Sequence, residues 1–197
     1  MKRVIGITGG IASGKSNVTN ICKSLGYEVI DSDSIVKELS VKNGPIFKAI
    51  VDTFGKNYLK IDGELDRAKL AKLVFNNIDA KNQMNKITHP IVVEEIKRRI
   101  STIDDGLIFV DIPLLFEGHL EYLCDKIICV FLKKKLQVER LMARDKIDED
   151  YALAKIHSQM DLYMKKELSD YVIDSKGDFE ETKQQVIKTI NDILGGN

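Results

Sequence analysis

The chain has 197 residues, of which 44% are apolar and 30% are charged, and its 30 basic and 30 acidic residues cancel to a net charge of zero. This length and composition predict a soluble globular protein, built as one domain or as one domain with an inserted lobe. The balanced charge argues against a broad nucleic-acid surface, and three cysteines without a C-x-x-C pair argue against a disulfide framework or a zinc site. Since no apolar segment is long enough to span a bilayer, we expect a cytoplasmic protein with no membrane, nucleic-acid or obligate protein partner.

The first 26 residues have the pattern of a strand, a glycine-rich turn and a helix. An apolar run predicts a strand over residues 3–8, and helical periodicity follows over residues 15–25 until Gly26. The turn between them fits G-x-x-x-x-G-K-S and consists of Gly9-Gly10-Ile11-Ala12-Ser13-Gly14-Lys15-Ser16. In this context the turn is a strong signal for nucleotide binding, because a phosphate loop offers backbone amides and a helix N-terminus to phosphate oxygens.

The phosphate loop also predicts which ligands are bound. Lys15 would reach the β- and γ-phosphates, and the Ser16 hydroxyl would hold a magnesium ion. The N-K-x-D motif that reads guanine is missing, because Asn85-Lys86-Ile87-Thr88 begins in that way and lacks the acid. We therefore expect ATP and Mg²⁺ rather than GTP. The residues expected to bind ATP within the loop are Gly10, Ile11, Ala12, Ser13, Gly14, Lys15, Ser16 and Asn17.

A second short strand is predicted over residues 28–30 and ends in Asp31-Ser32-Asp33. The βαβ connection makes the first two strands parallel members of one sheet. A carboxylate at Asp33 could accept the proton of an attacking hydroxyl, which is typically worth about 10²–10⁴ in rate, and Asp31 could assist that base or the metal. Spacing alone equally allows either aspartate to cap a helix over residues 34–39.

Residues 34–103 show helical patterns and no convincing strand. One of the predicted helices begins at His89-Pro90, since proline is common in a first helical turn. His89 itself is a weak candidate that could simply cap this helix. A helical insertion of this size between strands is often a substrate-binding lobe.

The α/β rhythm resumes after the insertion. Apolar runs predict strands over residues 107–111, 127–132 and 171–173, and an amphipathic helix follows over residues 178–194. The fold class is therefore α/β, a five-stranded, mostly parallel sheet with helices on both faces and a helical insert. Ligands of such sheets bind beyond the carboxyl ends of the strands, where Lys15, Asp33 and Asp111 are expected.

Two arginines lie four residues apart on a predicted helix after the fourth strand. Arg140 and Arg144 project from one helix face, and arginines that close over a moving phosphoryl group can contribute about 10³–10⁵ in rate. The alternative is a solvated helix face on which they pair with Glu139 and Asp145.

Taken together, these motifs resemble the dephospho-CoA kinase family over nearly the whole chain. The segments that carry the resemblance are Ile7-Thr8-Gly9-Gly10-Ile11-Ala12-Ser13-Gly14-Lys15-Ser16, Val29-Ile30-Asp31-Ser32-Asp33, Phe54-Gly55, Asp62-Gly63-Glu64-Leu65-Asp66-Arg67, His89-Pro90-Ile91, Asp111-Ile112-Pro113-Leu114-Leu115-Phe116-Glu117, Gln137-Val138-Glu139-Arg140-Leu141, Arg144, Ser158-Gln159 and Asp170-Tyr171-Val172-Ile173-Asp174. The phosphate loop alone is unspecific, whereas the series of motifs in this order is quite specific.

The resemblance implies a P-loop kinase fold and transfer of the γ-phosphate of ATP to the ribose 3′-hydroxyl of dephospho-CoA. The catalytic residues it implies are Asp33 as the base, Lys15 on the phosphates and Arg140 over the transferring phosphate, with Arg144 assisting at the ATP site and Ser16 on the metal. The acceptor residues it implies are Asp31, Arg67, His89, Pro113, Leu114 and Leu115. It also implies a nucleotide-binding core over residues 1–33 and 104–197, a lid over about 133–160, and a CoA-binding insert over 34–103.

Two departures from the family pattern bear on the site. Ala12 stands where glycine is common, which a small side chain should tolerate provided that its φ is negative. Ser175 stands where asparagine often contacts the adenine region, so what reads the adenine is left open. Two other functions stay as alternatives: a P-loop kinase for another small acceptor such as a nucleoside monophosphate, and a nucleotide-dependent switch with little catalysis.

Overall fold

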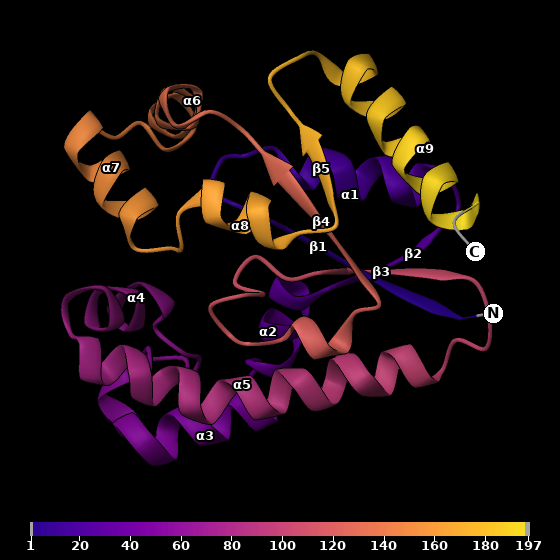
Figure 1. Cartoon of the computed structure of the whole chain (residues 1–197). Coiled ribbons are helices and arrows are strands. Elements are labelled where there is room, and N and C mark those ends of the chain that lie inside the picture. The colour runs from indigo at the N-terminus through magenta and orange to yellow at the C-terminus, as the bar shows by residue number, and fades with distance from the viewer. Residues whose placement is uncertain (1, 196–197) are drawn as a thin grey trace. The chain divides into compact units, whose positions relative to one another are not determined.

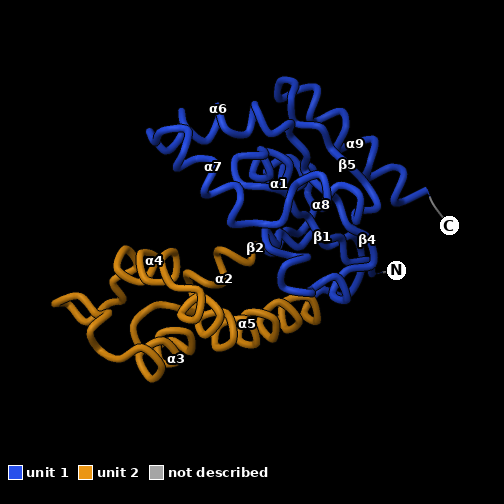
Figure 2. Tube along the Cα trace, turned by 60° about the vertical axis from the view of Figure 1, so that its left-hand side comes forward, with its two compact units in different colours: residues 1–30, 103–197 blue, residues 31–102 orange. Residues whose placement is uncertain are grey.

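The computed structural model describes residues 2–195. They divide into two compact units, one of residues 2–30 and 103–195 and the other of residues 31–102 (Figure 2). The borders between core and insert that the sequence predicts, at residues 33/34 and 103/104, lie within three residues of these. By its contacts, the acidic turn at Asp31–Asp33 belongs to the helical unit rather than to the sheet unit.

The first unit is built on the predicted five-stranded parallel sheet, whose strand order is β2-β3-β1-β4-β5 (Figure 1). The strands are β1 (Arg3–Gly9), β2 (Glu28–Asp31), β3 (Leu107–Asp111), β4 (Lys126–Phe131) and β5 (Tyr171–Asp174). β1 pairs in parallel with β3 and β4, and β4 pairs in parallel with β5. The two central neighbours β1 and β3 are almost wholly buried, as their apolar runs predict.

Helices cover both faces of this sheet. The helices of this unit are α1 (Lys15–Ser24), α6 (Lys134–Asp145), α7 (Glu149–His157), α8 (Leu162–Leu168) and α9 (Phe179–Gly195), with a 3₁₀ turn η2 (Glu121–Leu123). On β4, Ile128 joins a core cluster that contains residues of α1 and α9, whereas its neighbour Cys129 joins one that contains Leu162 of α8. Because successive strand residues point to opposite faces, α1 and α9 cover one face and α8 the other.

The second unit is helical, with α2 (Ser32–Leu39), α3 (Pro45–Phe54), α4 (Arg67–Asn76), α5 (Ile78–Ser101) and a 3₁₀ turn η1 (Lys56–Tyr58). The predicted helix start at His89-Pro90 is wrong, because α5 runs through Pro90 and begins at Ile78, after the N-cap Asn77, whose side chain accepts a hydrogen bond from Ala80 N–H at 3.0 Å. Proline costs a helix one backbone hydrogen bond and some steric strain. Helical sequence on both sides carries the 24-residue helix across that defect.

The three cysteines are free thiols. Cys22 and Cys129 are buried and Cys124 is partly buried, and burial raises the pKa of each thiol to about 12. These thiols are therefore protonated and unreactive at neutral pH. Among residues 2–195, no helix combines the length and the apolar character that crossing a membrane requires.

Candidate nucleotide-binding site

The phosphate loop is a tight turn between β1 and α1. Ser13 N–H donates to Gly10 C=O at 3.1 Å, and Asn17 N–H donates to Gly14 C=O at 3.0 Å. Gly14 has a φ of 85°, in the left-handed region that glycine adopts without strain. Asn17 N–H is thus already bound, whereas the amides of Lys15 and Ser16, which precede it in the first turn of α1, have no partner within the helix and are available to phosphate oxygens.

Ala12 departs from the expectation that its φ is negative. Its φ is 58°, in the left-handed region, where a side chain with a Cβ atom costs about 1–2 kcal/mol. The condition under which alanine would be tolerated here is therefore not met. Surrounding contacts must hold Ala12 in this conformation, and local sequence carries no signal for them.

Lys15 and Asp111 form an ion pair beside the loop. The Lys15 ammonium donates to the Asp111 carboxylate, and both side chains are largely buried, with 17% and 7% of their surface exposed. The parallel register explains the contact, because Ile7 of β1 lies opposite Asp111 at the end of β3. The predicted gathering of polar groups at the carboxyl ends of the strands is thus present for these two residues.

Ser16 lies exposed in the first turn of α1. Its hydroxyl and the Asp111 carboxylate are oxygen donors of the kind that Mg²⁺ prefers, so the side chains present fit this ion. Among the described residues, no three or more His, Cys, Asp or Glu side chains gather into a metal-binding group. Mg²⁺ is often held by one or two protein ligands together with substrate phosphates, an arrangement that Ser16 and Asp111 could serve.

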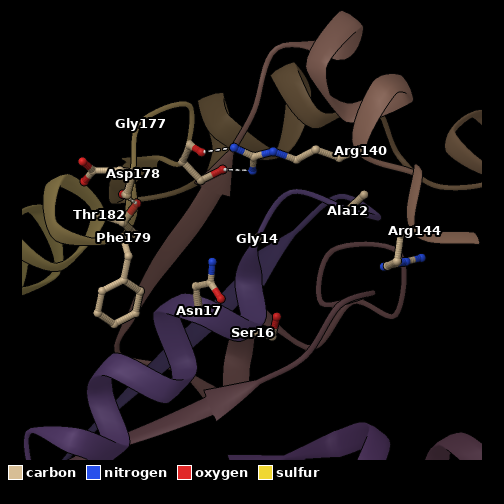
Figure 3. Close-up of a pocket in the computed structure, with 11 residues that line it drawn as sticks. Ala12, Gly14, Ser16, Asn17, Arg140, Arg144, Gly177, Asp178, Phe179 and Thr182 are labelled. Atoms are coloured by element: carbon tan, nitrogen blue, oxygen red, sulfur yellow. Dashed lines mark hydrogen bonds between the residues drawn. The ribbon is translucent and has the colours of Figure 1, made fainter. Parts of the chain in front are cut away.

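A pocket of about 330 Å³ opens beside the phosphate loop (Figure 3). Three segments line it: the loop and start of α1, helix α6, and the chain that follows β5. The lining residues are Ala12, Gly14, Ser16, Asn17, Arg140, Arg144, Ser175, Gly177, Asp178, Phe179 and Thr182. The exposed ring of Phe179 offers an apolar surface next to polar and cationic groups, which suits a ligand with both a flat base and phosphates.

Arg140 crosses the pocket to the chain after β5 (Figure 3). One of its terminal nitrogens donates to Ser175 C=O at 2.7 Å. The Ser175 hydroxyl is buried and donates to Ser13 C=O at 2.5 Å, so this hydroxyl ties β5 to the phosphate loop. The expected place of Arg140 over the transferring phosphate stays a prediction.

Arg144 has a different neighbourhood from Arg140. It is exposed and pairs with Asp145 at 2.7 Å, as in the alternative of a solvated helix face. The pKa of the Asp145 carboxyl is well below its usual range because it accepts hydrogen bonds from Arg144 and Lys155. Arg144 nevertheless lines the pocket, and its contact with ATP stays a prediction.

The turn after β3 is held by two donors on Pro113 C=O. Lys165 Nζ donates to it at 2.7 Å and Thr8 Oγ1 at 3.1 Å. Leu114 is partly exposed, whereas Leu115 is completely buried. A Cβ atom on Gly6 would lie 2.8 Å from a Leu115 methyl group, so Leu115 packs directly on β1 and supports the turn from the core.

The remaining predicted residues lie in the helical unit. Asp31 caps α2 by accepting hydrogen bonds from Asp33 N–H at 2.9 Å and Ser34 N–H at 3.1 Å. Asp33 is exposed, and its carboxylate has no hydrogen-bond or ion-pair partner among the described residues. Arg67 is also exposed and reaches Lys37 C=O of α2 at 3.5 Å, while His89 lies half-buried in the middle of α5.

Sequence reasoning missed two groups of residues around the loop. Gln137 and Gln159 bind the backbone of Ile11, and Asp178, Phe179 and Thr182 line the pocket. Both glutamines stand in segments that resemble the family, but nothing in their spacing indicates a partner more than 120 residues away. The residues from 177 to 182 follow a predicted strand, and their place at its carboxyl end is the signal that could have identified them.

Comparisons with known proteins show the family of this chain. The family model described as dephospho-CoA kinase matches residues 3–181. A dephospho-CoA kinase from Carboxydothermus hydrogenoformans is 45% identical over 187 residues, covering 93% of this chain and 91% of the relative. The solved dephospho-CoA kinase from Campylobacter jejuni is 33% identical with a TM-score of 0.74, covering 100% of both chains. Shikimate kinase from Aquifex aeolicus, 16% identical over 98% of this chain and 99% of its own, shares the fold with a TM-score of 0.54. The chain therefore belongs to the dephospho-CoA kinase family.

Proposed function

We propose that this chain phosphorylates the ribose 3′-hydroxyl of dephospho-CoA with ATP, giving coenzyme A and ADP. Membership of the dephospho-CoA kinase family makes it a kinase with ATP and dephospho-CoA as substrates. The observation that carries the assignment to a site is the phosphate loop, with Lys15 and Asp111 brought together at the ends of neighbouring strands. We also propose that the enzyme works in the cytoplasm without an obligate protein partner.

The ATP triphosphate lies on the phosphate loop in this proposal. The free amides at the start of α1 bind the phosphate oxygens, and Lys15 moves its ammonium from Asp111 toward the β- and γ-phosphates. Ser16 would hold magnesium, and the Asp111 carboxylate, which pairs with Lys15 of the loop, would be a second oxygen ligand for it. When bound, Mg²⁺ neutralises charge on the phosphates as the γ-phosphoryl group leaves.

Asp33 is proposed as the general base. Two aspartates compete for the roles of helix cap and base, and Asp31 takes the cap with three hydrogen bonds from Asp33 N–H, Ser34 N–H and Ser34 Oγ. The Asp33 carboxylate is left exposed and without a partner among residues 2–195, so it is available to accept a proton. This division of labour supports Asp33 over Asp31 as the group that activates the hydroxyl.

The rest of the acceptor is proposed to bind the helical unit and the turn after β3. Arg67, exposed beside α2, supplies a cation for the diphosphate of dephospho-CoA, and His89 supplies a hydrogen-bonding ring. Pro113 and Leu114 offer partly exposed apolar surface, with Leu115 supporting them from the core. Residues 133–160, with Arg140 and Arg144, act as the lid that excludes water during transfer.

Replacing Asp33 with asparagine tests the proposal. Asp33→Asn should lower kcat at least about 100-fold, because the amide cannot accept the proton, while the affinity for ATP measured by calorimetry stays within about twofold. Asp52→Asn is the matched control, since Asp52 is an exposed aspartate of the same unit. Near-normal turnover of Asp33→Asn would remove this residue from the role of base.

A panel of acceptors separates the proposed substrate from the alternatives. At saturating ATP, kcat/KM should be highest for dephospho-CoA and lower for nucleoside monophosphates. A preference for a mononucleotide would support another small-acceptor kinase. Slow turnover with every acceptor, together with a protein whose binding depends on the nucleotide, would support a switch.

A further inference from the structure

Both polar backbone groups of Ile11, at the tip of the phosphate loop, are bound by glutamine side chains. Ile11 N–H donates to Gln159 Oε1 at 3.0 Å, and Gln137 Nε2 donates to Ile11 C=O at 2.7 Å. Gln137 lies in the first turns of α6, and Gln159 follows the end of α7. The two glutamines therefore stand at the two ends of the α6–α7 segment, the proposed lid, and meet on a single residue of the loop.

Apolar contacts join the same two parts of the first unit. Ile11 and Ala12 pack against a cluster whose buried members are Val138 and Leu141 of α6 and Ala152 of α7. The tip of the loop is therefore part of the small core that holds α6 against α7. A movement of this helix pair would either carry the loop tip along or break these contacts.

The arrangement leaves little room for adjustment. Gln137 is only 3% exposed, and a Cβ atom on Gly10 would lie 2.5 Å from its Nε2 atom. The next residue but one, Ala12, has a φ of 58°, which needs outside support because it is strained for alanine. Two hydrogen bonds on Ile11, directly before Ala12, supply such support on both sides of the Ile11 residue.

We propose that Gln137 and Gln159 are positioning residues that hold the phosphate loop in its triphosphate-binding shape and couple it to the α6–α7 lid. The inference rests on the proposed use of this loop by ATP. It also bears on the prediction that Ile11 binds ATP, because Ile11 N–H already donates to Gln159. The phosphates are left to the amides that follow, at the start of α1.

Methionine variants separate hydrogen bonding from packing, since methionine has nearly the volume of glutamine and forms neither bond. We expect Gln137→Met and Gln159→Met each to raise KM for ATP about 10-fold, the effect of losing one buried hydrogen bond, and to lower kcat. KM for dephospho-CoA should stay within about twofold. Gln184→Met is the control, because Gln184 is exposed on α9 and, within residues 2–195, its side chain bonds only to Glu180 of the same helix at 2.8 Å.

Glutamate variants exploit the opposite roles of the two side chains. Gln159 accepts a hydrogen bond, and a glutamate there keeps the acceptor oxygen. Gln137 donates one, and a glutamate there loses the donor and sets a carboxylate against Ile11 C=O. Both changes bring the same negative charge to the loop, so Gln137→Glu should raise KM for ATP at least about 10-fold more than Gln159→Glu does.

Either of two results would overturn the inference. One is wild-type kinetics of both methionine variants in folded protein, as judged by their melting curves. The other is equal impairment of the two glutamate variants. Lys15→Ala tests the proposed ATP site itself. Unchanged ATP kinetics in that variant would show that ATP does not use the loop. Impaired ATP kinetics in Lys15→Ala, together with normal kinetics in the glutamine variants, would contradict only the positioning role.

Discussion

The phosphate loop of the first unit is held from several sides, whereas Asp33, Arg67 and His89 of the second unit carry exposed or lightly bonded side chains. Gln137, Gln159 and Ser175 all bond to the loop backbone, and Asp111 binds its lysine. In the helical unit, the Asp33 carboxylate and the His89 ring have no hydrogen-bond or ion-pair partner among the described residues. We infer that the fold preorganises the nucleotide side, while the acceptor side takes its final geometry from the substrate.

Replacing the loop lysine should have the largest effect. Lys15→Met should lower kcat/KM for ATP about 1,000-fold, because it removes the cation aimed at the phosphates and deprives Asp111 of an ion-pair partner. The loss should appear in both ATP affinity and turnover, whereas Asp33→Asn should lower turnover alone. Calorimetry measures the affinity, and steady-state kinetics measure the turnover. Lys23→Met, at an exposed lysine of α1, is the control. Equal losses of kcat/KM in Lys15→Met and Lys23→Met would contradict a preorganised nucleotide side.

The buried lysine beneath the turn after β3 comes next. Lys165 is completely buried, pairs with Glu117 at 2.8 Å and donates to Pro113 C=O at 2.7 Å. Lys165→Met leaves Glu117 charged without its cation, which should cost about 3 kcal/mol of unfolding free energy and lower the melting temperature by roughly 6–12 °C.

The exposed Lys188 on α9 supplies the matched control for this stability measurement. Lys188→Met should melt within about 2 °C of the wild type, since surface substitutions away from special features change stability little. A Lys165→Met protein as stable as this control would show that the first unit does not depend on the buried pair.

Relief of the strained loop residue should give a smaller effect of opposite sign. Ala12→Gly removes about 1–2 kcal/mol of left-handed strain from the folded state. It also costs about 0.4–1 kcal/mol, because glycine gives the unfolded chain more conformational freedom. The free energy of unfolding should therefore rise by about 0.5 kcal/mol. Urea unfolding measures the change. Ala154→Gly, at an exposed position of α7, should instead lose about 1 kcal/mol. A loss in both variants would contradict the strain.

The ion pairs that Glu95 of the helical unit forms with two arginines should contribute least. Glu95 accepts hydrogen bonds from Arg98 at 2.7 Å and Arg99 at 2.8 Å, and these bonds lower its carboxyl pKa from 4.5 to about 2. Because the folded pKa is depressed, the stabilisation is fully present above pH 4.5 and is lost as pH falls toward 2. Glu95→Gln should cost at most about 1 kcal/mol at pH 7.

The pH dependence of that variant is the sharper measurement. The difference in urea midpoint between Glu95→Gln and the wild type should shrink between pH 5 and pH 3, because the unfolded wild-type chain takes up the proton in this range while the folded carboxyl, with its pKa of about 2, stays ionised. High salt at pH 7 should also reduce it. A difference that stays constant with pH and salt would mean that Glu95 acts through packing rather than charge.

The sequence by itself was enough to predict the phosphate loop, the five strands in order, the helical insert and the family. These features depend on local patterns: apolar runs for buried strands, a glycine spacing for the loop, and motif order along the chain. It also offered Asp31 and Asp33 as cap and base without assigning them, because both lie within reach of the same helix start.

Only the tertiary structure assigned Asp31 to the cap, carried α5 through Pro90, and turned Ala12 to a positive φ. It alone brought Gln137 and Gln159 onto Ile11 and Arg140 onto Ser175. For the loop tip, the physical reason is distance along the chain. Hydrogen bonds and strain at the loop tip are settled by packing between segments more than 100 residues apart, and local propensity holds no record of such partners.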